Sequence, residues 1–396
     1  MSSSITRLLQ RLLGRLPIGW LQLSHSKTRL LTAVAGVTFA NILVFVQLGI
    51  LGALNGSSVA PYSLFNADIL LSSSDANTLS DGSNVARQRM FQALGVSGVY
   101  DASGVYIAMI EWQMEDGASS TLQVFGIDPD ADGFINSGIS KDVIQSLRIA
   151  DTALIDARTR GASPELFKDI SIDDPLIIEL KGITISAIGE LNVGSGFTSD
   201  GSLMVSDQTF LRLFVNRRAS APSHVLIKVN DGLSQGVIVS RLRKQLDTES
   251  VKVNTFDDAI AADLAYQTTE RPTGVIFGFG VLIGVLIGIV IVYQVLATDV
   301  ANHLREYATF KAMGYRQSFF TSIVFEEAIV LAVIGFLPGL AIASLLYAGL
   351  ASATGLPISM DTGRAVGVLL GTVVACGISG AIATRRLAGA DPADLF

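Results

Sequence analysis

The chain has 396 residues, of which 49% are hydrophobic and 16% charged, and its formal net charge is −7. It is too long and too apolar for one ordinary soluble domain, which favours a membrane protein with a sizeable polar part. A single cysteine, Cys376, excludes an intramolecular disulfide, and His25, His224 and His303 stand too far apart to predict a histidine-based metal site.

Residues 1–29 carry five basic side chains and no acidic one, and Leu8, Leu12 and Leu16 recur at helical spacing. This pattern predicts a cytosolic, basic amphipathic helix on a membrane surface, with Trp20 at the level of the lipid headgroups. A cleavable signal peptide is the alternative, but the basic region is long and no clear small-residue cleavage site follows it. We therefore expect a retained N-terminal anchor.

Four apolar stretches have the length that a helix needs to cross about 30 Å of hydrocarbon. They cover residues 30–53, 274–297, 322–348 and 365–384. Basic residues gather between the second and third stretches and after the fourth, whereas the third-to-fourth connection has only Arg364. The positive-inside rule then predicts that both termini are cytosolic. The remaining segments are a cytosolic coupling helix at 298–321, a periplasmic loop at 349–364 and a cytosolic tail at 385–396.

In this topology residues 54–271 form a periplasmic domain with 17 basic and 28 acidic side chains, a formal net charge of −11. Such acidity argues against nucleic acid as a partner. The order strand, helix, strand occurs at both ends of the domain and predicts a ferredoxin-like lobe from residues 54–115 and 221–271. Short β-rich runs predict an inserted β-rich lobe at 116–220. The expected fold class is an α-helical membrane protein with four transmembrane helices and a large α+β extracytoplasmic domain between helices 1 and 2.

Glycine repeats every four residues in two of the predicted spans. The two rows are Gly280, Gly284 and Gly288 in the second span and Gly363, Gly367 and Gly371 in the fourth. Rows of this kind let another helix approach closely. That helix belongs either to the same subunit or to a second copy across a dimer seam.

Glu326 and Glu327 lie about one turn into the third span. Carboxylates inside a membrane can carry protons, so a proton-driven transporter is one interpretation. Their shallow depth and the lack of a deeper partner favour the alternative, which is snorkelling or polar packing near the cytosolic face.

The connection at 298–321 is predicted to be a cytosolic helix that receives force from an ATPase on another chain. The candidate ATPase-coupling residues are Glu306, Tyr307, Phe310, Lys311, Met313 and Gly314. The two aromatic residues and the glycine fall on about one helical face, which would form a ridge that enters a groove. The glutamate and the lysine are five positions apart, too far for an ideal helical ion pair, so we expect both to be available to a partner. A helix lying on lipid headgroups is the alternative.

The letters EYATFKAMG at Glu306–Gly314 resemble the E-x-x-x-x-K-A-x-G pattern that follows the second span of MacB/FtsX-type ABC permeases. The stretch Pro17–Ile50 resembles the DevC branch of that family, the permeases of cyanobacterial exporters of heterocyst-type glycolipids. Further similarities are Glu327-Ala328, Gly335, Gly339, the tail Arg385–Pro392, VFGIDPD at 124–130 and DTALIDA at 151–157. In order and spacing these motifs cover almost the whole chain.

The resemblance implies a homodimeric permease of the inner membrane that works by mechanotransmission in a tripartite efflux system. Its partners would be a DevA-like ABC ATPase, a DevB-like periplasmic membrane-fusion adaptor and a TolC-like outer-membrane channel. Its cargo would be a glycolipid or another amphiphile. ATP and Mg²⁺ would bind to the ATPase, and this chain has no G-x-x-x-x-G-K-[ST] phosphate loop. We expect neither a cofactor nor a catalytic residue in the permease itself.

Two other functional classes stay open. An FtsX-like signal transmitter would activate a periplasmic cell-wall hydrolase, and it differs from an exporter in what its external domain binds. A membrane-tethered enzyme is less favoured, because His224 lies in a strand-like run with no nucleophile motif near it.

Overall fold

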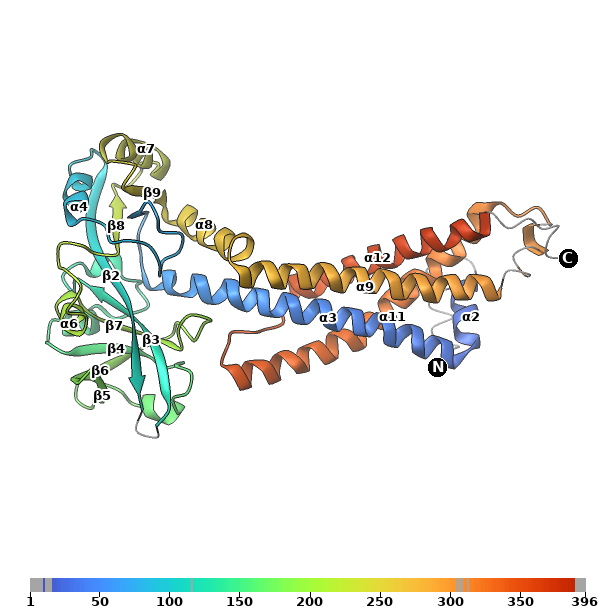
Figure 1. Ribbon diagram of the computed structural model, residues 1–396, viewed down its shortest axis with the longest axis horizontal. Helices are drawn as coiled ribbons and strands as arrows, with labels where there is room; N and C mark the ends of the chain where they lie inside the picture. The colour runs from blue at the N-terminus through green and yellow to red at the C-terminus, as the bar shows by residue number, and fades with distance from the viewer. Residues whose placement is uncertain are drawn as a thin grey trace. The chain divides into compact units, whose positions relative to one another are not determined.

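The computed structural model describes residue 10 and residues 16–114, 117–303, 306, 309–311 and 313–388. The chain divides into two compact units. One unit comprises Met1–Leu51, Val275–Leu350 and Ile358–Phe396, and the other comprises Gly52–Gly274 and Ala351–Pro357. The first is helical and the second is built around a β-sheet, as Figure 1 shows. The predicted fold class, four apolar helices with a large α+β domain between the first two, is confirmed.

In the part of the helical unit that the structure describes, bounds are defined for four long helices and one short helix. Their bounds are α2 Ile18–His25, α3 Lys27–Val59, α9 Pro272–Asn302, α11 Gln317–Thr354 and α12 Thr362–Ala388. In their most apolar stretches the four long helices have mean hydropathies from 2.1 to 3.1, and each is long enough to cross a membrane. An α-helix satisfies its own backbone hydrogen bonds, as hydrocarbon requires, so these sequences form unbroken helices.

Helix α2 packs against the long helices. Trp20 and Leu23 are buried in a core that they share with side chains of α3, α9, α11 and α12. The structure therefore places Trp20 in a protein core, whereas the sequence suggested a site among lipid headgroups. Gly19 permits this approach, because a Cβ atom there would stand 2.8 Å from Cγ of Glu327 on α11. Residues 1–9 and 11–15 of the predicted N-terminal helix lie outside the described residues.

The second unit, here called the sheet domain, holds one nine-stranded sheet in the order β5-β6-β4-β7-β3-β2-β8-β1-β9. The strands are β1 Ile69–Ser73, β2 Val99–Gln113, β3 Ser119–Ile127, β4 Thr152–Asp156, β5 Leu176–Leu180, β6 Ile183–Leu191, β7 Gly201–Ser206, β8 His224–Val229 and β9 Val251–Thr255. The helices are α4 Arg87–Leu94, α5 Lys141–Ser146, α6 Asp207–Leu213, α7 Gln235–Gln245 and α8 Phe256–Thr269. Three short 3₁₀ helices are η1 Ala60–Leu64, η2 Asp132–Phe134 and η3 Pro164–Phe167.

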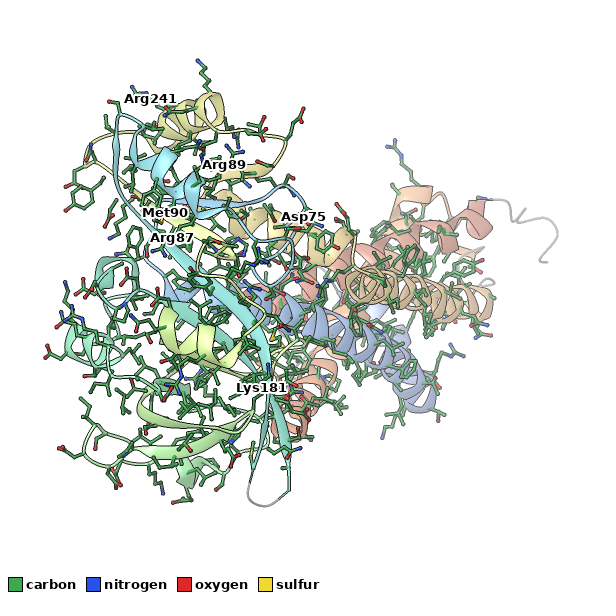
Figure 2. The ribbon with its side chains drawn as sticks, turned by 60° about the vertical axis from the view of Figure 1, so that its left-hand side comes forward. Asp75, Arg87, Arg89, Met90, Lys181 and Arg241 are labelled. Atoms are coloured by element: carbon green, nitrogen blue, oxygen red, sulfur yellow. The ribbon has the colours of Figure 1, made fainter. Side chains whose placement is uncertain are left out.

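Both ends of the sheet domain combine into a ferredoxin-like half. The strands β9, β1, β8 and β2 are neighbours in that order and every pair is antiparallel. The helices α4 and α7 of the two strand-helix-strand units cover one face of this half through a shared apolar core. In Figure 2, Arg87, Arg89 and Met90 mark α4 and Arg241 marks α7. An ion pair of 3.1 Å between Arg89 and Asp247 joins the two helical segments at the surface.

The inserted part shares its sheet with the ferredoxin-like half. Residues 99–105 of β2 pair with β8, and residues 106–113 of the same strand pair with β3. Beyond β3 the sheet turns partly parallel, because β3 pairs in parallel with β7 and β4 in parallel with β6. The sequence predicted two lobes, and the length of β2 makes them two halves of one continuous sheet.

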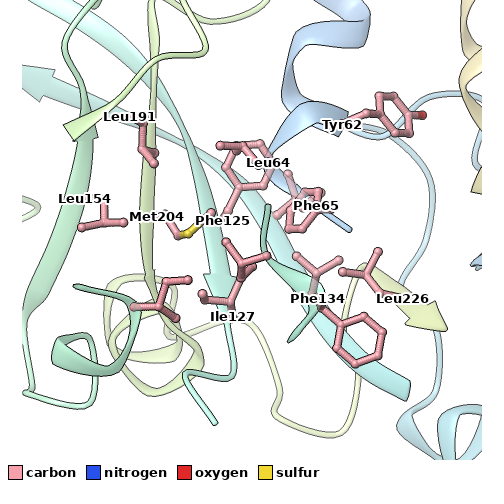
Figure 3. Close-up of a cluster of buried hydrophobic side chains, with 14 of the residues drawn as sticks. Tyr62, Leu64, Phe65, Phe125, Ile127, Phe134, Leu154, Leu191, Met204 and Leu226 are labelled. Carbon is pink, nitrogen blue, oxygen red and sulfur yellow. The ribbon is translucent and has the colours of Figure 1, made fainter. Parts of the chain in front are cut away.

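The two faces of the sheet carry separate cores. In β1, Ile69 and Leu71 face the core under α4 and α7, whereas Leu70 faces an aromatic-rich core on the other side. Figure 3 shows this second core, in which the rings of Phe65 and Phe125 meet edge to face at 5.7 Å. Alternation of side chains along a strand places neighbours on opposite faces.

Candidate functional site

The connection between α9 and α11 is interrupted by a turn. Residues 309–311 are helical, and Met313 and Gly314 then form a turn before α11 begins. The described residues of 298–321 therefore do not form the single helix that the sequence suggested. The turn leaves Met313 61% exposed.

A glycine cap produces this turn. Gly314 has φ +94°, and its N–H donates to the Lys311 carbonyl at 3.0 Å. The Tyr315 N–H donates to the Phe310 carbonyl at 3.2 Å. These two bonds form a Schellman motif, in which a glycine in the left-handed region satisfies the last helical carbonyls. The need for a left-handed residue at the end of the helix thus explains the glycine in the E-x-x-x-x-K-A-x-G pattern.

An aromatic cluster supports the capped turn from inside. The ring of Phe310 meets Tyr315 at 5.6 Å and Phe319 at 6.4 Å, and Tyr315 meets Phe319 at 4.8 Å. Phe310 is half-buried and packs against the core of the helical unit. Its ring therefore fixes the turn to the helices, whereas the sequence suggested a ridge facing outward.

The other predicted coupling residues differ in exposure. Glu306 is exposed, as expected of a residue available to a partner. Lys311 is half-buried and already engaged within the chain, which its spacing from Glu306 did not suggest. Tyr307 lies outside the described residues. Among the described residues of the coupling set, the exposed ones are therefore Glu306, Met313 and Gly314.

A charged pair joins α3 to the end of α9, just before this connection. Arg29 donates to Asp299 through Nη1 and Oδ1 at 2.9 Å, and the Asp299 side chain is 0% exposed. His303 Nδ1 lies 3.0 Å from the Asp299 carbonyl and 3.4 Å from its Oδ2. Because Asp299 is fully buried, removal of Arg29 would leave an uncompensated charge, at a cost of about 3–5 kcal/mol.

Two carboxyl groups of α11 lie beside this pair. Glu326 Oε1 accepts a hydrogen bond of 3.4 Å from the main-chain N–H of Trp20 on α2. Glu327 is 0% exposed, and Asp299, Glu326 and Arg29 are the charged groups that act on it. Neither side chain snorkels, so polar packing describes them better. Together the residues join α2, α3, α9 and α11 at the base of the connection.

The glycine row of α9 packs on α3. A Cβ atom at Gly280 would stand 2.5 Å from Gln47, one at Gly284 would stand 3.0 Å from Val44, and one at Gly288 would stand 3.2 Å from Ala40. Contact within one subunit therefore accounts for this row.

The glycine row of α12 meets no neighbour along most of its length. A Cβ atom at Gly367 or Gly371 would find nothing within 4 Å, and one at Gly363 would meet only the nearby Asp361. Gly367 and Gly371 line an apolar cavity of about 210 Å³ with side chains of α3 and α9. Its role in dimer formation stays a prediction.

In the sheet domain, a buried carboxyl group anchors α8, the helix that directly precedes α9. Asp263 is 2% exposed, and its Oδ2 accepts from the Tyr62 hydroxyl and from the Leu79 N–H, both at 3.1 Å. Gln267 donates to the other oxygen at 3.3 Å. Burial is the main cause that raises the pKa of Asp263 above its usual value. Tyr62 follows α3 directly, so Asp263 links the segments that continue α3 and α9.

A buried histidine holds the same loop from its other side. His224 Nε2 lies 2.9 Å from the Leu79 carbonyl and Nδ1 lies 2.9 Å from the Ser72 hydroxyl. Neutral His224 satisfies both contacts if Nε2 donates and Nδ1 accepts, which is the tautomer we assign. Burial lowers the pKa of His224 below its usual value. This histidine is therefore a structural hydrogen-bonding residue.

Sequence reasoning missed the partners in both networks. Arg29 comes directly before the first predicted span and Asp299 directly after the second, so both lie at the same predicted side of the membrane. This shared position was the available signal for their pairing. Asp263 and Tyr62 carry no such signal, because their contact depends on the tertiary path of the chain. In the part of the chain that the structure describes, no three His, Cys, Asp or Glu side chains come together as a metal site.

Four membrane-spanning helices joined to a large sheet domain define an integral membrane protein. Residues 278–392, which hold most of α9 together with α11 and α12, match the model of the FtsX-like permease C-terminal family. This part of the chain is therefore similar to the C-terminal region of FtsX-like permeases. A search of curated protein sequences finds no significant match.

Three solved structures are similar to about half of the chain. The periplasmic region of MacB from Actinobacillus actinomycetemcomitans has 10% identity and a TM-score of 0.35, with 50% of this chain and 92% of that chain covered. The extracellular domain of the noncanonical ABC-type transporter YknZ from Gram-positive bacteria has 14% identity and a TM-score of 0.33, with 48% and 100% covered. A domain of a putative permease from Porphyromonas gingivalis has 13% identity and a TM-score of 0.28, with 48% and 86% covered.

Proposed function

We propose that the chain is the permease subunit of an ABC exporter, in which a separate ATPase drives movement that reaches the sheet domain through the spanning helices. The observation that carries this proposal is the FtsX-like permease match, which includes the α9–α11 connection. The exposed turn at Met313 stands beside a half-buried aromatic cluster and a buried charged pair, so force applied there would act on α9 and α11 together.

Two consecutive helices, α9 and α8, would carry movement from the turn to the sheet domain. Helix α9 runs without a break from Asn302 to Pro272, and α8 precedes it with only two residues between them. The buried Asp263 ties α8 to Tyr62 and Leu79. A lever of this kind needs a stiff helix and a firm anchor, and α9 with Asp263 would supply both.

The remaining parts of the proposal extend the family resemblance. In it, the permease is a homodimer of the inner membrane with both termini and the α9–α11 connection in the cytosol. A DevA-like ATPase binds there, while a DevB-like adaptor and a TolC-like channel receive the cargo on the other side. The cargo is a glycolipid or another amphiphile, and ATP and Mg²⁺ bind only to the ATPase.

The second candidate is an FtsX-like signal transmitter that activates a periplasmic cell-wall hydrolase. The family match supports it as much as export, because the match covers the permease region and not the sheet domain. The two differ in the partner of the sheet domain, which is an adaptor for export and a hydrolase for signalling.

One affinity purification of the tagged full chain from its native membrane tests these proposals. We expect an ABC ATPase to copurify, and Met313→Glu to lower its recovery at least tenfold, since an exposed apolar contact would be replaced by a charge. Tyr100→Glu is the matched control, because Tyr100 is 71% exposed in the sheet domain. Equal recovery of the ATPase with Met313→Glu would reject the turn as its docking site. An adaptor among the copurified proteins favours export, and a hydrolase favours signalling.

A further inference from the structure

Asp299 and Glu327 form a buried pair of carboxyl groups at the base of the α9–α11 connection. Both residues are 0% exposed. Among the described residues, Oδ2 of Asp299 and both carboxyl oxygens of Glu327 have no hydrogen-bond donor. The Glu327 side chain lies within hydrogen-bonding reach of Asp299. Two carboxyl groups in such contact need an explanation, because each ionised oxygen would repel the other.

Among the described residues, the charges around the pair do not balance two carboxylates. From α3, Arg29 reaches Oδ1 of Asp299 at 2.9 Å. From α9, His303 Nδ1 approaches Oδ2 of Asp299 at 3.4 Å, and from α11 Glu326 adds a further negative charge. Helix α2 contributes the Trp20 N–H, which is directed to Glu326, and the backbone of Gly19, which packs on the Glu327 side chain. In the part of the connection that the structure describes, Arg29 therefore faces three carboxyl groups.

We propose that Asp299 and Glu327 bind one proton between them, with Glu327 as the protonated partner that donates to Oδ2 of Asp299. A carboxylic acid has one O–H donor, whereas two carboxylates have none, so the proton turns a repulsion into a hydrogen bond. Asp299 is the better acceptor because Arg29 already neutralises it. The step is the addition of H⁺ to one carboxylate oxygen of Glu327 and consumes nothing else.

The competing occupants fit this site less well. A metal cation would approach Arg29, and the described residues include no set of three ligands arranged for a metal. A water molecule could donate to Glu327, but an ionised Glu327 would still repel Asp299 and Glu326 across the same space. The proton is the smallest ligand that joins one oxygen of Glu327 to Oδ2 of Asp299 and removes the repulsion between these two groups.

The proton would act as a clamp between α9 and α11. These two helices flank the connection, and the protonated pair adds a hydrogen bond to the apolar contacts between their ends. Separation of the helices would let water reach Glu327 and release the proton. This consequence rests on the proposed function, whereas the existence of the shared proton does not.

Infrared spectroscopy of the purified full chain in detergent, without any ATPase, tests the proton directly. We expect the carbonyl stretch of a protonated carboxylic acid at pH 7, and its loss in Glu327→Gln. The matched control is Glu306→Gln, which removes an exposed carboxyl group of the same connection and should leave the band unchanged. A spectrum without the band at pH 7, or a band that survives Glu327→Gln, would overturn the proposal.

A second pair of variants tests the hydrogen bond by stability. Glu327→Gln keeps an N–H donor toward Asp299, so its unfolding temperature should stay close to that of the parent chain. Glu327→Leu has a similar size but no donor, and it should unfold at a clearly lower temperature. Equal unfolding temperatures for the Gln and Leu variants would contradict a donating Glu327. Because neither measurement uses the ATPase, failure of the ATPase-docking experiment would leave this result standing.

Discussion

At the scale of single residues, two buried polar side chains hold one loop of the sheet domain, the loop that contains Leu79. Asp263 accepts from the main-chain N–H of Leu79, and His224 contacts the carbonyl of the same residue. A loop held on both sides in this way loses much of its freedom to slide between α8 and the sheet. The contacts are worth more here than on the surface, because a buried group left without its partner costs about 1–3 kcal/mol.

We predict that His224 makes the protein less stable in acid. Burial lowers its pKa in the folded state, while the unfolded chain keeps a value of about 6.5, so the folded state binds fewer protons. Stability is therefore retained above pH 6.5 and lost as pH falls below it, at a slope approaching roughly 1.4 kcal/mol per pH unit. Thermal unfolding of the full chain in detergent between pH 8 and pH 5 measures this slope.

The variant His224→Gln should reduce this slope, because glutamine stays neutral throughout that range. His25→Gln is the control, since His25 is exposed on α2 and should leave the slope unchanged. Asp263 acts with the opposite sign, because burial raises its pKa and its folded state binds more protons. Asp263→Asn in the same background separates the two contributions. A slope that persists in His224→Gln would show that other groups cause the acid sensitivity.

At the scale of elements, the two glycine rows have different surroundings. The row of α9 faces side chains of α3 at contact distance, whereas Gly367 and Gly371 of α12 face open space. Both rows have the same four-residue spacing, so sequence alone could not separate them. The difference arises because a row of small residues allows close helix packing, but the tertiary fold decides whether a helix lies against that row.

We predict that Gly284→Leu and Gly371→Leu have unequal effects. Leucine at Gly284 would overlap Val44 and should destabilise the protein by about 1–3 kcal/mol through overpacking. A Cβ atom at Gly371 meets no atom within 4 Å and the residue lines a cavity, so leucine there should change the stability of the monomer by about 0.5 kcal/mol or less. Thermal unfolding with light scattering in detergent measures stability and mass together. A monomer equally destabilised by both variants would contradict the packing described, while a loss of dimer in Gly371→Leu alone would support a seam along α12.

Element boundaries also show what the sequence could predict. The ferredoxin-like half was predicted, because the strand-helix-strand pattern repeats at both ends of the sheet domain. The break at Gly314 was missed, since the local pattern of Phe310 and Lys311 is equally typical of a longer helix. A left-handed glycine becomes visible only when the hydrogen bonds that end the helix are known.

At the scale of the whole molecule, the proposed function depends on which side of the membrane each part occupies. Basic residues cluster around the α9–α11 connection, which the positive-inside rule places in the cytosol. The sheet domain is then periplasmic. This orientation is a proposal from charge alone, since the helices are apolar along most of their length.

We predict opposite labelling of two cysteines placed in these parts. Cys376→Ala removes the single native thiol, which is buried in α12, and Met313→Cys or Tyr100→Cys then provides one exposed thiol. In intact cells whose outer membrane has been made permeable, a membrane-impermeant maleimide should label Tyr100→Cys and spare Met313→Cys. Lysed cells should give label on both, which controls for accessibility. The reverse pattern in unlysed cells would invert the topology and remove the cytosolic ATPase site.

By itself, the sequence determined the class of this protein: four apolar helices, a large α+β domain between the first two, and a permease motif after the second. The helices and the domain follow from local composition and periodicity, which act over a few residues at a time, and the motif follows from its resemblance to a known family. Only the tertiary structure decided the pairing of Asp299 with Arg29, the contact of Asp299 with Glu327, and the anchor at Asp263. Those contacts join residues up to 270 positions apart, and burial, which gives them their energetic weight, exists only in the folded chain.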